Sequence, residues 1–167
     1  MHKNILTEQA LYYGDVKMPK GFEINHHKLK SEILQSKIEN RDFRFCKDWD
    51  KLNTFIREHI YLKFKIALIN KSTWGNLFKP LTNTESLLEV NLMDLKHAPD
   101  FVLLYGVQVK DCLIKIFYDN NRRKGNCWDI ELKNNMFIMF PSTNTYTIHN
   151  KKNDDLNIIQ TITYEYT

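Results

Sequence analysis

Cysteine is scarce in this chain of 167 residues, and its three cysteines form no recognisable pattern. Cys46, Cys112 and Cys127 are an odd number and lack the CxxC spacing of paired ligands. This argues against both a disulfide framework and a cysteine-bound zinc site. We therefore expect three buried thiols.

Long apolar runs are also missing. No uninterrupted apolar stretch approaches the roughly 20 residues that span a bilayer, so no membrane segment is predicted. The first residues, MHKNILTEQALYY, lack the charged, apolar and small-residue pattern of a secretory signal. We therefore expect the protein to stay in the cytoplasm in which it is made.

Glycine and proline are few, whereas lysine, asparagine and isoleucine are abundant. This bias is typical of AT-rich coding, and the net charge of +4 is mild. We interpret the charge as genome composition rather than as a nucleic-acid surface. The length fits a single domain, with an N-terminal arm and two helices over 1–62 and a jelly-roll body over 63–167.

The first predicted helix covers residues 26–38. Asn25 is suited to cap its N-terminus, and His26 and His27 in its first turn are expected to be solvated. Its apolar residues recur at helical spacing and are Leu29, Ile33, Leu34 and Ile38.

The second predicted helix covers residues 49–60, with Asp48 as its cap. It carries an amphipathic stripe of Leu52, Phe55, Ile56, His59 and Ile60. We expect His59 to be a packed residue at the edge of the core. Both helices are predicted to pack on the outside of one sheet.

From Phe64 onward the apolar spacing changes from helical to alternating, which predicts a mainly β body. Met136 to Phe140 indicates a buried strand, and the Pro141-Ser142 turn ends it. The number and spacing of strands favour a jelly roll or another β-sandwich. The other predicted strands are Trp74–Phe78, Leu87–Leu92, Phe101–Val109, Cys112–Tyr118, Trp128–Leu132, Thr143–Ile148 and Leu156–Tyr166.

Residues 119–126 have the composition of a polar hairpin tip, with Arg122, Arg123 and Lys124 in a row. These side chains could hold a phosphate or a carboxylate, or could be solvated. A nucleic-acid surface usually adds aromatic residues and a broader basic stripe, so we favour the solvated loop.

His97, Asp100 and His149 are candidate metal ligands. A non-haem iron(II) site needs two imidazoles and one carboxylate on one side of the metal. His97 precedes a strong predicted strand, and His149 follows the strand after the Pro141-Ser142 turn. Asp100 would supply the carboxylate.

Several motifs point to a known family; they are Lys71–Asn76, His97–Pro99, Leu104–Val107 and Phe140–Ser142. On these residues, about the last hundred of the chain resemble the small 2-oxoglutarate and iron(II)-dependent oxygenases of the prolyl-hydroxylase-like superfamily. Runs such as YDNNRRKG, MFPST and IIQTITYEY extend a closer resemblance, to proteins of T4-like marine phages that infect picocyanobacteria, over nearly the whole chain. The resemblance implies a double-stranded β-helix, iron and 2-oxoglutarate as cofactors, and hydroxylation of a protein or small molecule. If the chain is phage-encoded, the compartment is the host cytoplasm.

The ligand pattern that the resemblance implies is displaced here. The family's first ligand pair is His-x-Asp, whose side chains share one strand face, whereas His97 and Asp100 are one residue further apart. The distal histidine would fall at Tyr146, and His149 lies at an odd offset from that position. We therefore expect at most one of the two histidines to point into the barrel.

The arginine that the family uses for the 2-oxoglutarate carboxylate is missing from residues 156–159. Arg122 and Arg123 are the nearest alternatives in sequence.

Two functions from different classes remain open. The first is an iron(II) and 2-oxoglutarate dioxygenase with His97, Asp100 and His149 as ligands and with Tyr105 or Tyr146 lining the pocket. The second is a non-catalytic binding or virion-associated module without a cofactor, which the displaced ligand pattern favours. Its partner would be a protein or a small molecule, neither a membrane nor a nucleic acid. Ile158 to Tyr166 alternates and, at a sheet edge, would pair with a second copy to give a homodimer.

Overall fold

The computed structural model describes residues 9–39, 47–119, 126–151 and 155–167. Two helices and a short 3-10 helix accompany the strands; they are α1 (His26–Glu39), α2 (Lys47–Phe64) and η1 (Leu95–His97). The strands are β1 (Tyr12–Asp15), β2 (Leu68–Phe78), β3 (Phe101–Gln108), β4 (Cys112–Asp119), β5 (Asn126–Leu132), β6 (Met136–Pro141), β7 (Thr145–Asn150) and β8 (Asn157–Tyr166).

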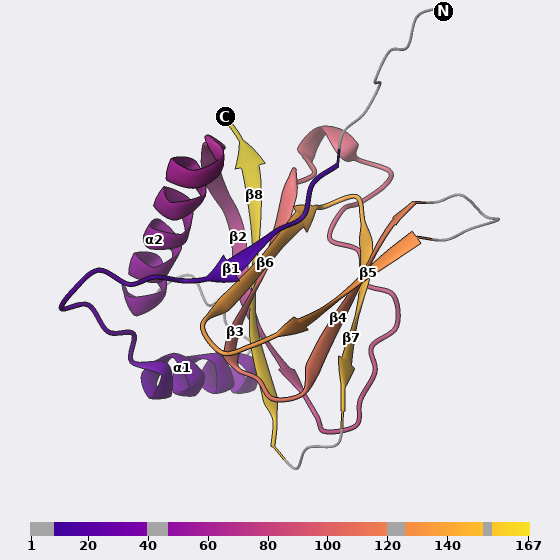
Figure 1. Cartoon of the computed structure of the whole chain (residues 1–167). Coiled ribbons are helices and arrows are strands. Elements are labelled where there is room, and N and C mark those ends of the chain that lie inside the picture. The colour runs from indigo at the N-terminus through magenta and orange to yellow at the C-terminus, as the bar shows by residue number, and fades with distance from the viewer. Residues whose placement is uncertain (1–8, 40–46, 120–125, 152–154) are drawn as a thin grey trace, which may run out of the picture.

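The strands form two antiparallel sheets. One has the order β1-β6-β3-β8-β2 and the other the order β5-β4-β7. Figure 1 shows the larger sheet between the two helices on one side and the smaller sheet on the other. The predicted double-stranded β-helix with helices packed on one sheet is confirmed.

The helices pack on the outer face of the larger sheet. Asn25 Oδ1 accepts a hydrogen bond from the Lys28 backbone N–H at 2.9 Å, as expected of an N-cap. Residues of both helices are fully buried in the core that they share with β3, β6 and β8; they are Leu29, Ile33, Trp49, Leu52, Ile56 and Ile60. The apolar stripe of α2 and the Leu29 and Ile33 positions of α1 therefore face the sheet. Ile38, predicted to belong to the α1 stripe, is instead 84% exposed.

Helix α2 begins and ends outside its predicted limits. It starts at Lys47, before the predicted cap, and continues to Phe64. Lys65 then adopts a left-handed conformation with φ of 59°, a common way for a helix to end. The β body therefore starts at Leu68 rather than at Phe64.

A second core fills the space between the two sheets. Its inward positions recur at every second residue of β4 and β7, as the pleat of a strand requires. The buried residues are Val102, Leu104, Val109, Cys112, Ile114, Ile116, Ile130, Leu132, Met136, Ile138, Phe140, Tyr146, Ile148 and Ile159. This apolar interior is the place where a jelly roll can hold a ligand.

Three sequence predictions need correction. Leu87–Leu92 is not a strand, because within it only Leu87 pairs with the sheet, through an isolated bridge to Tyr146. A turn follows, in which the Asp94 N–H donates to the Asn91 carbonyl. Cys127 is exposed rather than buried, because β5 is the edge of its sheet. His26 is partly buried rather than solvated, because its ring reaches a tyrosine under the helices.

The last strand does not lie at a sheet edge, which was the condition for the expected pairing with a second copy. β8 lies between β2 and β3, and Thr161 is paired with Trp74 on one side and with Leu104 on the other. The backbone groups of β8 therefore already have partners, and this strand cannot pair with a second copy.

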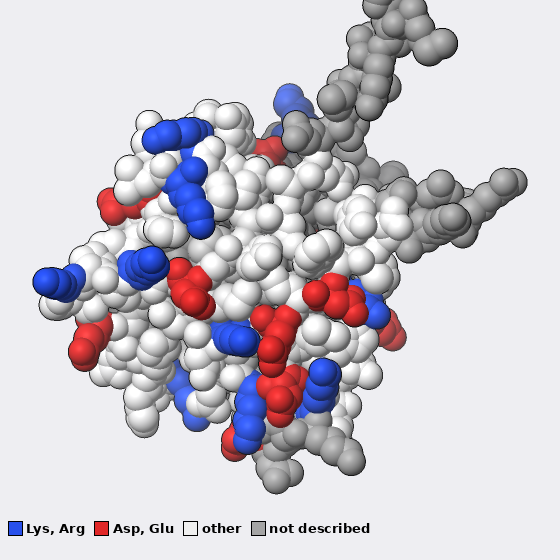
Figure 2. All heavy atoms as spheres, viewed as in Figure 1, with Lys and Arg blue, Asp and Glu red and all other residues white. Residues whose placement is uncertain are grey.

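Charged residues of both signs are interspersed on the face shown in Figure 2. That face carries no broad patch of a single sign among the described residues. Neither helix of the described ranges has the length and apolar composition needed to cross a membrane.

His26 gives the fold a pH dependence that can be tested. Its Nε2 lies 3.2 Å from the Tyr105 hydroxyl, and burial lowers the pKa of the imidazole from 6.5. The unfolded chain then binds more protons than the folded one, so this contribution to stability is present above about pH 6.5 and is lost as the pH falls through the folded pKa. We expect the midpoint of urea denaturation to fall less between about pH 7.5 and about pH 5.5 in a His26→Gln variant than in the wild type.

A matched His27→Gln variant, changed at the exposed neighbour, should keep the wild-type pH dependence. Equal pH dependence of the two variants would show that His26 is not its source.

Candidate binding site

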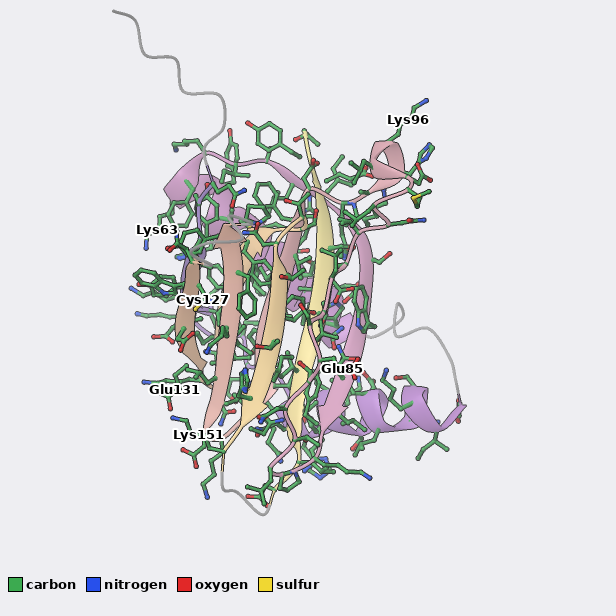
Figure 3. The ribbon with its side chains drawn as sticks, turned by 90° about the vertical axis from the view of Figure 1, so that its right-hand side faces the viewer. Lys63, Glu85, Lys96, Cys127, Glu131 and Lys151 are labelled. Atoms are coloured by element: carbon green, nitrogen blue, oxygen red, sulfur yellow. The ribbon has the colours of Figure 1, made fainter. Side chains whose placement is uncertain are left out.

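An irregular segment, residues 82–89, lies along the free edge of β7. The Leu87 and Tyr146 backbones exchange two hydrogen bonds, of 2.8 and 3.0 Å, and the Thr84 N–H donates to the Ile148 carbonyl at 3.0 Å. Figure 3 shows this segment, marked by Glu85, beside the strands of the body. It brings Glu89 next to the inward side of β7.

Tyr146 and Glu89 form a hydrogen bond inside the sandwich. The Tyr146 hydroxyl donates to Glu89 Oε1 at 2.6 Å, and the Tyr146 side chain is 1% exposed. Burial, followed by the charge of Glu89 and the hydrogen bond to it, raises the pKa of the phenol well above its usual value. The phenol therefore stays protonated and acts as the donor to Glu89.

The surroundings of Tyr146 are apolar. Its ring packs edge-to-face on Phe140, with centroids 5.2 Å apart, and Ile148 and Ile116 belong to the same cluster. The Cys112 thiol is also in this core, and burial raises its pKa to about 12. Because a thiolate rather than a thiol is the nucleophile, Cys112 is not suited to covalent chemistry.

The hydrogen bond of Tyr146 should contribute measurably to stability. We expect Tyr146→Phe to lower the free energy of unfolding by about 2 kcal/mol, because it leaves a carboxylate without its donor. Urea denaturation of Tyr146→Phe, Glu89→Gln and the double variant would give the coupling energy. Tyr118→Phe is a matched control, because Tyr118 is 44% exposed, and it should change stability by less than about 0.5 kcal/mol. A Tyr146→Phe variant as stable as this control would contradict the buried contact.

The structure does not bring the three candidate iron ligands together. His97 is exposed in η1, where its Nδ1 lies 2.9 Å from Asp94 Oδ1. Figure 3 shows η1, marked by Lys96, at one end of the molecule. Asp100 is exposed and its Oδ2 accepts the Tyr166 backbone N–H at 2.7 Å.

His149 lies on the outward side of β7, the opposite face from Tyr146 and Ile148. Its Nε2 is 2.8 Å from the Thr147 hydroxyl, which shares this face. Within residues 9–39, 47–119, 126–151 and 155–167, no three His, Cys, Asp or Glu side chains are placed to hold a metal ion. The residues present do not fit an iron centre.

The other predicted site residues are dispersed. Tyr105 lies on the helix-facing side of β3, where its hydroxyl donates to Asn135 Oδ1 at 2.9 Å, so it does not share a cavity with Tyr146. Arg122 and Arg123 fall outside the described residues, as does the predicted hairpin tip between β4 and β5.

An apolar pocket opens at the end of the sandwich where β6 turns into β7. It has a volume of about 280 Å³ and is lined by Gln9, Ala10, Leu11, Ile116, Tyr118, Trp128, Phe140 and Asn144. Phe140 connects it with Tyr146, since the two rings are in contact. Asn144, Trp128 and Glu89 were not predicted to be site residues. For Glu89, the sequence offers one signal, a glutamate within the apolar run LLEV.

Comparisons with known proteins agree on the fold. The sequence matches no family model and no curated protein sequence. A prolyl-4-hydroxylase of Pseudomonas putida superposes with a TM-score of 0.66 at 12% identity, over 95% of this chain and 89% of that one. AviO1 of Streptomyces viridochromogenes gives 0.65 at 10% identity, over 94% and 90%. The viral collagen prolyl hydroxylase of Paramecium Bursaria Chlorella virus-1, in complex with 2OG, gives 0.61 at 12%, over 92% and 94%. The chain thus shares the double-stranded β-helix fold of these proteins.

Proposed function

We propose that this chain is a non-catalytic binding module that uses the oxygenase-type β-helix as a rigid scaffold. The observation that carries the proposal is the hydrogen bond from the buried Tyr146 to the partly buried Glu89. The family resemblance puts the distal iron ligand at Tyr146. The Tyr146 hydroxyl already donates to the Glu89 carboxylate, so this side chain is proposed to hold residues 82–89 against β7 rather than to replace the imidazole ligand.

The positions of the histidines support the same proposal. His97 is paired with Asp94 at the exposed end of the molecule, and His149 faces away from the sandwich interior. Neither ring is near the inward side of β7, where Tyr146 lies. The scaffold is therefore proposed to hold a ligand by shape and hydrogen bonding instead of by a metal.

The pocket beside Phe140 is the proposed ligand site. It opens at the mouth of the sandwich, and among its described lining residues none carries a charge. A site for 2-oxoglutarate would have to neutralise two carboxylates, usually with an arginine or lysine. The partner is accordingly proposed to be an uncharged small molecule or an uncharged part of a protein.

An active dioxygenase is the second candidate. Its support is the fold likeness to a prolyl hydroxylase that was solved with 2OG bound. For this function, His97, Asp100 and His149 would have to leave their present partners and converge on one metal.

Anaerobic titration with iron(II) and a succinate assay separate the two functions. We expect protein purified without chelator to bind iron(II) no better than a His97→Ala, His149→Ala double variant, and to form no succinate from 2-oxoglutarate. Stoichiometric iron uptake that is lost in the double variant, together with succinate formation, would overturn the proposal and establish the dioxygenase.

A further inference from the structure

Uncharged side chains of three kinds surround the pocket at the mouth of the sandwich. Leu11 and Ile116 are aliphatic, and Gln9 and Ala10 belong to the N-terminal segment that closes one side. The aromatic residues are Tyr118, Trp128 and Phe140, and the most buried polar residue is Asn144. The described lining therefore combines flat apolar surfaces with one buried amide.

Asn144 is held in position by the turn between β6 and β7. Its backbone N–H donates to the Pro141 carbonyl at 3.0 Å, and Ser142 is anchored by its N–H to the Asp100 carbonyl at 2.9 Å. The Ser142 hydroxyl also donates to the Pro99 carbonyl. The turn is thus fixed from both ends, and the position of Asn144 does not depend on a ligand.

The side-chain amide of Asn144 has a donor and an acceptor that can form further hydrogen bonds. The residue is 7% exposed, yet its side chain makes no hydrogen bond to any other residue that the structure describes. The amide oxygen and nitrogen are not among the fully buried side-chain atoms that lack a partner. A ligand that supplies both a donor and an acceptor at the pocket wall can pair with both amide atoms.

Three aromatic residues of the lining offer surfaces for a flat ligand. Phe140 is fully buried at the base, while Trp128 and Tyr118 remain 52% and 44% exposed at the rim. Exposed aromatic rings beside a pocket offer stacking surfaces for planar groups. A volume of about 280 Å³ is at the small end of ligand sites, which limits the bound part to about one bicyclic ring.

We propose that this pocket binds an adenine ring, stacked against Trp128 and paired through its amino group and adjacent ring nitrogen with the Asn144 amide. Asparagine can donate to adenine N7 and accept from the N6 amino group at the same time, which satisfies both ends of the amide. The ring is uncharged, as the described lining requires. The ring could come from a free nucleoside or from a base of a single-stranded nucleic acid, which present the same chemistry here.

This inference rests on the proposed binding function, but the two are tested separately. Titration calorimetry with adenosine should give saturable binding, and inosine, which lacks the amino donor, should bind at least about 10-fold more weakly. Both Asn144→Leu and Trp128→Ala should weaken adenosine binding at least about 10-fold. Trp128 is half exposed, so its variant should remain folded even if the Asn144 variant does not.

A matched control comes from the neighbouring groove. Tyr166 is an exposed aromatic residue at the same end of the sandwich but lines a different pocket, with Asp100 and Phe101. Tyr166→Ala should bind adenosine as the wild type does. No binding of adenosine, equal binding of inosine, or unchanged binding in Trp128→Ala would each overturn the inference, whereas succinate formation would overturn only the proposed function.

A second titration, with a short single-stranded oligoadenylate, distinguishes a free nucleoside from a nucleic-acid base as the bound adenine. Binding that is tighter than that of adenosine and falls steeply with salt would assign the pocket to a nucleic-acid base, because phosphate contacts release counterions. Binding no tighter than that of adenosine would assign it to the free nucleoside. Either result agrees with an adenine site.

Discussion

A Trp49→Ala variant is expected to lose about 3–5 kcal/mol of its free energy of unfolding. Trp49 is 0% exposed at the start of α2, and its ring centroid lies 6.1 Å from that of Tyr105 on the larger sheet. Truncation would leave a cavity between the helix and the sheet that neither backbone can fill without moving. Urea denaturation followed by circular dichroism would measure the loss.

Trp128→Ala is the matched control for this experiment. Both changes remove the same side chain, but Trp128 is half exposed on the edge strand β5. We expect a loss of less than about 1 kcal/mol, in line with surface substitutions. Similar losses in the two variants would show that α2 is not packed on the sheet as described.

Gly106→Ala should be the second large effect, with a loss of about 3 kcal/mol from overpacking. A Cβ at this position would lie 2.2 Å from the Lys133 carbonyl oxygen and 2.9 Å from Val109 Cγ2. The oxygen cannot easily retreat, because the Asn135 N–H donates to the Gly106 carbonyl at 2.8 Å and holds the two segments together. The measurement is again the free energy of unfolding in urea.

Gly14→Ala tests whether the cost comes from this close approach or from replacing any strand glycine. At Gly14 the nearest atom to a Cβ, apart from the adjoining residues, would be Phe137 Cε1 at 3.9 Å, an ordinary contact distance. The variant should differ from the wild type by less than about 1 kcal/mol. If Gly14→Ala is as destabilised as Gly106→Ala, the steric explanation is wrong.

Local patterns were sufficient to predict most of the fold. The stripe from Leu52 to Ile60 and the alternation of Ile114 and Ile116 each reflect a single face that an element buries, so a short window contains the signal. The Leu87–Leu92 prediction was wrong because apolar alternation also occurs in a segment that touches the sheet at one bridge only. Alternation reports burial, whereas a strand also needs a partner for its backbone.

The candidate site was harder to predict, since it depends on contacts between distant parts of the chain. Parity along β7 placed Tyr146 and His149 on opposite faces, and the structure has them so. The partner of Tyr146 is Glu89, which belongs to an irregular segment with no motif. For Tyr105, β3 is buried on both faces, so its sequence pattern does not indicate which side each residue takes.

The central position of β8 has a consequence for synthesis. Of the strands in the larger sheet, β8 is the last to leave the ribosome, yet β2 and β3 are joined only through it. Until residues 157–166 emerge, each of those strands presents an unpaired edge that can recruit another chain. In a nascent chain halted just before β8, the larger sheet therefore consists of the three strands β1, β6 and β3, and β2 has no partner strand. Such a chain presents open strand edges, which favour aggregation.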